Sequence, residues 1–150
     1  MLDAATIAEK LPAGFREVRG EAFMETVGPI HARDAGDGTW DIGCRAGPQH
    51  ANRFGGVHGG MLATLVDYAL GFNLLGEGHA QAPAILLSTI SLNIDFVSGA
   101  RMGEWLVVST RIDKAQGRIR FCHCEMRADA GRLVLRASGV LSAAPLKPSV

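Results

Sequence analysis

One carboxylate stands in the middle of a long apolar stretch of this chain, a short distance after a pair of glycines. Between Gly59 and Leu75 the only charged side chain is that of Asp67. A carboxylate is costly to bury unless it is paired or hydrogen-bonded, and aspartate is a poor residue for the interior of a helix. Catalysis would offset both costs, so we take Asp67 as a candidate catalytic group.

Gly59 and Gly60 stand where a helix is expected to begin. The first backbone N–H groups of a helix have no internal acceptor, and the helix dipole adds partial positive charge there. Glycines also let a ligand atom approach the backbone closely. These features predict an oxyanion hole, a site for a carbonyl oxygen that gains negative charge. The alternative is a glycine-rich turn without a ligand, since such dipeptides are common in turns.

The spacing of these groups bears on how they could cooperate. Asp67 follows Gly60 by seven residues, which corresponds to about 10 Å along a helix axis. One chain therefore cannot bring both groups to the same carbonyl carbon. Either they do not cooperate, or two subunits related by a two-fold axis each contribute one of them, which gives two sites per dimer. A third possibility is a buried Asp67 bonded to a backbone group or to Asn73.

Four further polar side chains could take part, although each has an ordinary structural explanation. His58 could orient a substrate or act as an acid or base, or it could pack in the loop. Asn52 could polarise a carbonyl, or it could hold the loop through its side chain. Ser88 and Thr89 lie early in the strand expected after the helix, where a hydroxyl could position a water.

Several other kinds of site are not supported. The chain has no Gly-x-Ser-x-Gly motif for a serine nucleophile and no phosphate-binding or dinucleotide-binding glycine pattern. The run Cys122-His123-Cys124 is a poor metal site because adjacent residues of a strand face opposite ways and no second ligand pair follows. With Cys44, these are the three cysteines. We expect structural thiols, no metal and no cofactor.

Hydrophobic periodicity predicts one long helix and about six strands in a single domain, residues 1–150. In chain order we expect a helix over 3–11 with Asp3 as its N-cap, strands over 22–33 and 39–46, a loop over 47–57, the central helix over 59–75, a loop over 76–83, and strands over 85–97, 105–113, 118–128 and 131–143. In the strand over 118–128 the apolar face switches after Phe121, which predicts a bulge or burial on both faces. A helix that is apolar all round must be covered by other elements. The expected fold is therefore α+β, an antiparallel sheet wrapped around the helix.

Composition limits the classes of function. Hydrophobic residues make up 47% of the chain and charged residues 20%, with a formal net charge of +0 and a pI of about 7.0. No basic surplus indicates a nucleic acid or anionic membrane partner. The few cysteines and the lack of a signal peptide lead us to expect a cytoplasmic protein, and the apolar run is too short to span a membrane.

Two segments together resemble a known family. They are Asn52 … Gly56-Val-His58-Gly59-Gly60 … Asp67 and the strand Leu87-Ser-Thr89-Ile-Ser-Leu-Asn93-Ile-Asp-Phe96. Between about residues 28 and 143 the chain resembles hotdog-fold acyl-CoA thioesterases, most of all the phenylacetic-acid-degradation (PaaI-like) type, which is related to 4-hydroxybenzoyl-CoA thioesterases. In that family a sheet wraps a central helix and two subunits form each active site.

The resemblance implies roles for these residues. Asp67 would be the catalytic carboxylate, as a base that activates water or as a nucleophile, and the Gly60 N–H of the neighbouring subunit would receive the oxyanion. Asn52 and His58 would line the same half of the site. Thr89 matches a family Ser or Thr near the water, with Ser88 as the substitute if the register is off by one.

The resemblance also implies a set of substrate contacts and an assembly. Gly59, Ser88, Val57 and Leu62 would contact the substrate, and the acyl pocket would be walled by Leu62, Leu65, Phe72 and Leu74. The protein would be a homo-oligomer, a dimer with shared sites and by resemblance a tetramer.

Two alternatives to an acyl-CoA thioesterase remain. One is a non-catalytic acyl-CoA binding or sensing module on the same fold, since fold does not fix function. The other is an acyl-CoA hydratase or dehydratase, which would need a closer Asp/His pair than His58 and Asp67 form on one chain. The acyl group is not indicated by the sequence. Candidates for contacts to the CoA nucleotide, chosen only by charge, are Arg101, Arg111, Arg118 and Arg120.

Overall fold

The computed structural model describes residues 11–76 and 84–147. Of the helix predicted over residues 3–11, only Leu11 lies within the described part of the chain, so that prediction falls outside it. No helix among the described residues is long and apolar enough to cross a membrane.

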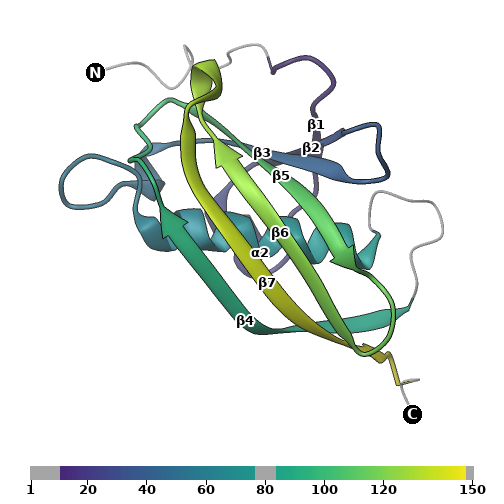
Figure 1. Ribbon diagram of the computed structural model, residues 1–150. Coiled ribbons are helices and arrows are strands. Elements are labelled where there is room, and N and C mark those ends of the chain that lie inside the picture. The colour runs from purple at the N-terminus through teal and green to yellow at the C-terminus, as the bar shows by residue number, and fades with distance from the viewer. Residues whose placement is uncertain (1–10, 77–83, 148–150) are drawn as a thin grey trace.

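The described chain forms a seven-stranded sheet in which every neighbouring pair is antiparallel (Figure 1). In spatial order the strands are β1 (Arg16–Val18), β2 (Ile30–Asp34), β3 (Trp40–Arg45), β5 (Trp105–Lys114), β6 (Ile119–Arg127), β7 (Leu133–Pro145) and β4 (Ile85–Phe96). The 12-residue β4 is an edge strand that pairs only with β7. The sheet therefore has one long free edge.

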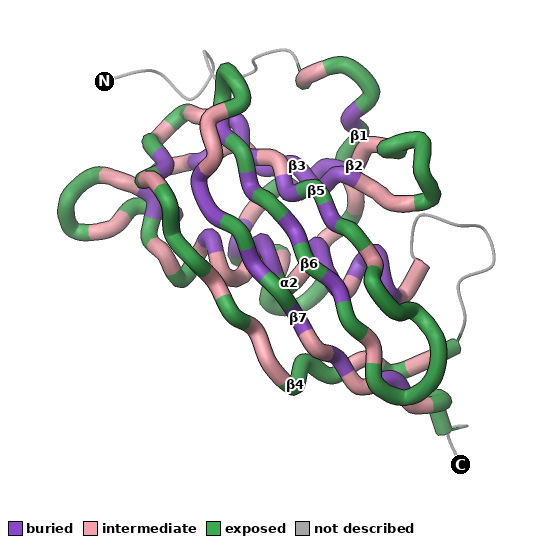
Figure 2. The backbone as a smooth tube through the Cα atoms, viewed as in Figure 1, coloured by how far each residue is buried: buried purple, intermediate pink, exposed green. Residues whose placement is uncertain are grey.

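A single long helix, α2 (Gly59–Leu75), lies across one face of the sheet, behind it in Figure 1. It contacts β3, β4, β5, β6 and β7. Leu65, Val66, Ala69 and Leu70 of α2 are completely buried against the inward-facing side chains of the strands, such as Leu106. Figure 2 shows the resulting alternation of buried and exposed residues along β5, β6 and β7. The predicted α+β fold with a sheet around a central helix is confirmed.

Both ends of α2 have clear chemical causes. At the N-terminus the His58 side chain accepts a hydrogen bond from the Gly60 N–H, which satisfies one of the unpaired donors of the first turn. At the C-terminus Gly76 adopts φ 68° and ψ 28°, a left-handed conformation that glycine takes without steric cost. The predicted bounds of this helix, 59–75, are those that the structure shows.

The segment between residues 22 and 33 differs from the prediction of one strand. Residues Phe23–Val27 form a short helix, α1, and β2 begins only at Ile30. Gly28 has φ 106° and Pro29 follows it, so the chain turns sharply between the two elements. The three-residue β1 was not predicted, and two short 3₁₀ turns, η2 (Pro48–His50) and η3 (Asp129–Gly131), interrupt predicted loops.

The irregularity predicted near Phe121 exists, but the extra residue belongs to the neighbouring strand. Ile112 pairs with Cys122 and Lys114 pairs with Phe121, which leaves Asp113 of β5 unmatched. Within β6, Cys122, Cys124 and Met126 are buried, whereas Phe121 and His123 are exposed. The two thiols therefore share the inner face and His123 points away from them, as strand alternation predicts.

All three cysteines are free and buried. Burial raises the pKa of Cys44 to about 11, of Cys122 to about 11 and of Cys124 to about 12. The thiols are thus held in their protonated form and act as small apolar core residues.

Candidate active site

Asp67 is hydrogen-bonded to the strand at the free edge of the sheet. The Thr89 hydroxyl of β4 donates to Asp67 Oδ1 over 2.7 Å. Ser88 precedes Thr89 and pairs with Ser142, so its side chain lies on the outer face of the sheet, away from α2. Of the two hydroxyls considered from the sequence, the structure brings Thr89 to Asp67 and not Ser88.

Asp67 is exposed in the single chain, so the possibility of a buried aspartate is wrong. Asn73 does not bond it. The Asn73 side chain instead accepts from the Trp40 N–H and donates to the Trp40 and Ala69 carbonyls, which ties the helix to β3. In the single chain the carboxylate therefore does not carry the free-energy cost of burial that pointed to a special role for Asp67.

The exposed side of α2 is a continuous stripe. Gly60, Thr64, Asp67 and Gly71 follow one another at spacings of four, three and four residues, which places them on one face of a helix. Each is exposed or half-buried, and a Cβ added to Gly71 would meet nothing within 4 Å. A second protein surface could approach the helix along this stripe.

The two glycines at the start of α2 are not equivalent. The N–H of Gly60 donates to His58 Nδ1 over 2.8 Å. The N–H of Gly59, the first residue of the helix, has no acceptor among the described residues. In the single chain the free donor at the positive end of the helix dipole is therefore that of Gly59, and Gly60 can serve a ligand only after the His58 ring moves.

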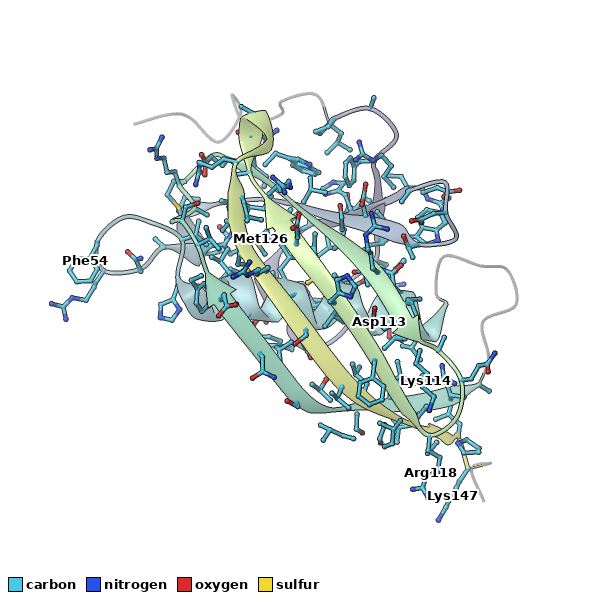
Figure 3. All side chains as sticks on the ribbon, in the orientation of Figure 1. Phe54, Asp113, Lys114, Arg118, Met126 and Lys147 are labelled. Atoms are coloured by element: carbon cyan, nitrogen blue, oxygen red, sulfur yellow. The ribbon has the colours of Figure 1, made fainter. Side chains whose placement is uncertain are left out.

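Asn52 holds the loop before α2. Its Oδ1 accepts from the N–H groups of Phe54, over 2.8 Å, and of Gly56, over 3.1 Å. The structural explanation for Asn52 is thus the one that the geometry supports. The tip of this loop carries Phe54, which projects away from the body of the molecule and is 82% exposed (Figure 3).

A cavity of about 370 Å³ opens beside the start of α2. It lies between α1, η2 and the first turns of the helix, and its walls include Phe23, Val27, His50, His58, Met61 and Thr64.

The side chains predicted to wall an acyl pocket are elsewhere. Leu62, Leu65, Phe72 and Leu74, together with Val57, are at most 6% exposed and pack in the core under the sheet. Their apolar side chains face the strands, so they are not available to a ligand at this surface.

Comparison with known proteins identifies the fold that carries this arrangement. The sequence model of the thioesterase superfamily matches residues 54–135, more than half of the chain. The chain belongs to the thioesterase superfamily. It is a thioester hydrolase on the predicted hotdog fold.

Two relatives and two solved structures illustrate the similarity. A Pseudomonas aeruginosa protein named "Putative esterase PA0474" is 34% identical over 131 residues, 87% of this chain and 95% of its own length. Human acyl-coenzyme A thioesterase 13 is 28% identical over 113 residues, 75% of this chain and 78% of its own. The E. coli PaaI protein of the phenylacetic acid degradation operon superposes with a TM-score of 0.72 at 17% identity, covering 83% of this chain and 86% of its own. A hypothetical thioesterase of Streptococcus pneumoniae, solved with coenzyme A, superposes with a TM-score of 0.70 at 16% sequence identity, covering 89% of this chain and 99% of its own. At these identities the superpositions show the fold.

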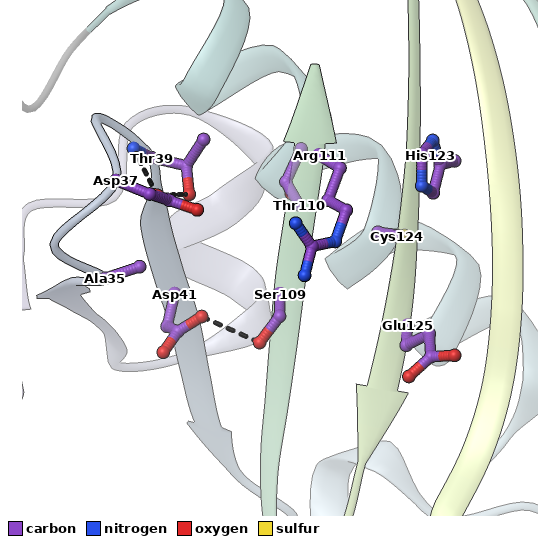
Figure 4. A pocket seen from close by; sticks show the side chains of 10 residues that line it. All are labelled: Ala35, Asp37, Thr39, Asp41, Ser109, Thr110, Arg111, His123, Cys124 and Glu125. Atoms are coloured by element: carbon purple, nitrogen blue, oxygen red, sulfur yellow. Dashed lines mark hydrogen bonds between the residues drawn. The ribbon is translucent and has the colours of Figure 1, made fainter. Parts of the chain in front are cut away.

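A second hollow of about 390 Å³ lies on the outer face of this thioesterase domain, across the sheet from α2 (Figure 4). It contains a network of polar side chains in which Asp41 accepts from Ser109 over 2.7 Å and is paired with Arg33. None of the residues predicted to form the active site lines it. The candidate site formed by Asp67 and the first turn of α2 lies on the opposite face of the sheet from this hollow.

The four arginines considered for the CoA nucleotide occupy different places. Arg111 lines the outer hollow, and Arg120 donates to the Leu74 carbonyl near the end of α2. Arg118 lies at the end of the sheet opposite the loop of Phe54 (Figure 3). Arg101 is exposed, and its backbone bridges Gly56 in the loop before α2. Of the four, Arg101 is the one whose backbone pairs with the loop before α2.

Sequence reasoning missed α1 and His50 as parts of this site. His50 is 5% exposed; its Nδ1 accepts from the Gly47 N–H over 3.0 Å and its Nε2 contacts the Val27 carbonyl at 2.6 Å. A carbonyl can only accept, so the Nε2 atom carries the proton and both ring nitrogens are used. The available signal was Pro29 inside the predicted strand, since proline rarely occurs within a strand.

Proposed function

We propose that this thioesterase hydrolyses an acyl-CoA thioester to a free acid and CoA, with Asp67 as the catalytic carboxylate. The observation that carries the proposal is the exposed Asp67 carboxylate held by Thr89 on the same helix whose N-terminus presents an unpaired backbone donor. Relatives named acyl-coenzyme A thioesterase and a structural neighbour solved with coenzyme A support CoA as the leaving group.

The chemistry follows from the charges. Water, or Asp67 itself, attacks the thioester carbon, and the carbonyl oxygen becomes negative as the tetrahedral intermediate forms. The first turn of α2 stabilises that oxygen through backbone N–H groups and the helix dipole. If water attacks, Asp67 accepts its proton, and collapse of the intermediate expels the CoA thiolate and leaves the acid. If Asp67 attacks, the same collapse leaves an acyl-aspartyl anhydride, which a water molecule then hydrolyses to the acid and the free Asp67 carboxylate. The Thr89 hydroxyl fixes one carboxylate oxygen, so the other is directed to the water or the substrate.

Two backbone donors are available for the oxyanion. If the Gly60 N–H keeps its hydrogen bond to His58, the donor is the Gly59 N–H; if the substrate carbonyl displaces the His58 imidazole, the donor is the Gly60 N–H. A proline at residue 59 distinguishes the two. Proline is accepted at the first position of a helix, the preceding His58 has the extended ψ of 132° that a proline requires, and a Cβ there meets Phe96 at 3.5 Å, an ordinary contact. Gly59→Pro therefore removes one N–H while leaving the helix in place.

The distance along α2 supports a site shared by two chains. Asp67 and the first turn of its own helix are about 10 Å apart, so the proposal combines Asp67 of one subunit with the helix start of its partner. The free edge of β4 and its exposed Leu86 and Ile90, 55% and 58% exposed, suit pairing between two copies. A dimer with two such sites, assembled further into a tetramer in the cytoplasm, is part of the same proposal.

The first experiment measures thiol release from a panel of acyl-CoAs. Wild type should release CoA, and Asp67→Asn should lose at least about a thousandfold in kcat with fold and oligomeric state unchanged. Asp95→Asn is the matched control, because Asp95 is an exposed aspartate of β4 whose pairing with Arg136 is on the surface. Near-normal turnover of a correctly assembled Asp67→Asn protein would contradict the role of Asp67. Acyl-CoA binding without turnover in wild type would favour the sensing module.

Mixed oligomers test the shared site. If Gly59 is the donor, Asp67→Asn and Gly59→Pro subunits are each inactive alone and should recover about a quarter of wild-type activity together, because half of the dimers are mixed and each has one intact site. Asp67→Asn mixed with Thr89→Val is the control, since both changes damage the same half of the site and the mixture should not exceed the residual activity of its Thr89→Val subunits. Mixed dimers that form but stay inactive would place the whole site within one chain.

A further inference from the structure

The cavity beside the start of α2 is lined by apolar and neutral polar side chains and by no Asp, Glu, Lys or Arg side chain. Phe23 and Val27 of α1 face Met61 of α2 across it. Glu25, the acidic residue of α1, is exposed and does not line the cavity. Its volume of about 370 Å³ lies within the range of small-molecule sites, roughly 300–1,000 Å³.

Several polar side chains in the walls are already bonded within the protein. Both ring nitrogens of His50 are used, as described above, and the Thr64 hydroxyl donates to the Gly60 carbonyl over 2.9 Å. Gln49 Nε2 donates to the Val27 carbonyl over 3.4 Å. A ligand rich in amides, such as the pantetheine arm of CoA, would find these groups occupied. An apolar group needs none of them.

The wall formed by α1 is held by hydrogen bonds at its C-terminal end. His50 and Gln49 both bond the carbonyl of Val27, at the C-terminal end of α1. At the other end Ala22 has φ 51°, a left-handed conformation that is uncommon for a residue with a side chain. Phe23, next to it, is 64% exposed although it borders the cavity. Phe23 is thus the apolar wall residue with most surface left for a ligand to cover.

We propose that this cavity receives the acyl group of the substrate, that it selects uncharged, apolar acyl groups, and that Phe23 determines how well their chains are held. The inference rests on the proposed function. With the carbonyl oxygen at the first turn of α2, the acyl chain and the sulfur leave the carbonyl carbon in different directions, and His58 and Gly60 place this cavity at that turn. An acyl group ending in a carboxylate would bury its charge without a cation, which is strongly unfavourable.

Hexanoyl-CoA and adipoyl-CoA test the selection, because their acyl groups differ only in a terminal methyl or carboxylate. Wild type should favour hexanoyl-CoA in kcat/KM by about tenfold or more. Phe23→Ala should reduce the preference for hexanoyl-CoA over acetyl-CoA about fivefold, because the acetyl group has no chain to contact the ring. Thr26→Arg, which places a cation on the exposed Thr26 of the same wall, should raise the relative rate for adipoyl-CoA.

The matched control is Phe121→Ala, which removes a partly exposed phenyl ring from the outer face of β6 and should leave both ratios unchanged. Equal rates for hexanoyl- and adipoyl-CoA, or the same change of ratio in Phe23→Ala and Phe121→Ala, would overturn the assignment.

Calorimetric binding of the same two thioesters to Asp67→Asn separates this inference from the proposed hydrolysis. Binding that prefers hexanoyl-CoA and weakens with Phe23→Ala supports the cavity even if wild type releases no thiol, and binding without that preference overturns it.

Discussion

The Thr89 hydroxyl donates a 2.7 Å hydrogen bond to Asp67 Oδ1 and so joins the exposed stripe of α2 to the edge strand β4. A carboxylate that accepts such a bond keeps one oxygen fixed and the other free to act. A hydrogen bond to a charged group is worth about 1.5–3 kcal/mol. The loss of this bond is therefore expected to change the catalytic rate by a measurable factor.

Replacement of Thr89 by valine should lower kcat about tenfold to a hundredfold, because a free-energy change of about 1.4 kcal/mol is a factor of ten. Thr89→Ser keeps the hydroxyl and should stay within about threefold of wild type, which makes it the matched control. Steady-state kinetics on one acyl-CoA measure both. Equal losses in the valine and serine variants would show that the methyl group of Thr89, and not its hydroxyl, is what matters.

Arg101 should contribute to binding of the CoA nucleotide, because its backbone adjoins the loop before α2. Arg101→Gln should raise KM for an acyl-CoA severalfold, and more at low salt, where a contact between exposed charges is least screened. It should leave KM unchanged for the corresponding N-acetylcysteamine thioester, which lacks the nucleotide. Arg118→Gln, at the far end of the sheet, is the control and should change neither value.

The central elements of the fold could be predicted because their local signals agree with one another. The helix of residues 59–75 has an uninterrupted apolar run, a capping His58 and a terminating Gly76, so its bounds were predicted correctly. The alternation of apolar and polar residues along β5 and β7 also matches the burial that the structure shows. The first part of the strand predicted over 22–33 was wrong, because residues Phe23–Val27 form a helix, whereas the strand does begin at Ile30. Val27 and Ile30 are both buried, and a buried apolar residue near a turn does not distinguish a helix from a strand.

The candidate site was predicted in part, for a different physical reason. Asp67 and Thr89 are 22 residues apart, and their contact follows from the register between β4 and the helix, which no local pattern encodes. The choice between Ser88 and Thr89 depended on which face of the strand each occupies. The cavity walls depend on α1, whose C-terminal end is held by bonds from Gln49 and His50 to the Val27 carbonyl.

His31 should make the protein less stable as the pH falls below about 6.5. Burial is the largest influence on its pKa, which it lowers from 6.5, while Glu17 and a hydrogen bond with the Gly43 backbone act in the opposite direction. The ring is 7% exposed, stands 5.3 Å from that of Trp105, and its Nδ1 has no partner among the described residues. Because the folded pKa is the lower one, the unfolded chain takes up the proton first as the pH falls. The free energy of unfolding therefore decreases from about pH 6.5 down through the folded pKa, and His31 contributes no slope above this range.

Urea unfolding at several pH values between 5 and 8 measures this contribution. His31→Gln should flatten the decrease below pH 6.5, whereas His123→Gln, which changes an exposed histidine paired with Asp113, should retain it. A decrease of the same steepness in His31→Gln and wild type would assign the pH dependence to other groups.

Gly139 of β7 lies against Leu70 of α2, and alanine there should destabilise the fold. A Cβ at this position would lie 2.7 Å from Leu70 Cδ1 and 3.3 Å from Leu141 Cδ1. Leu70 is completely buried, so its side chain has little room to move away. Overpacking of this kind typically costs about 1–3 kcal/mol, which exceeds the gain of roughly 0.5–1 kcal/mol from removing a glycine within a strand. Gly99→Ala is the control, since a Cβ there meets nothing within 4 Å. Chemical denaturation should show a lower midpoint for Gly139→Ala alone, and an unchanged midpoint would mean that Leu70 can repack and that α2 is held less tightly against β7 than this contact implies.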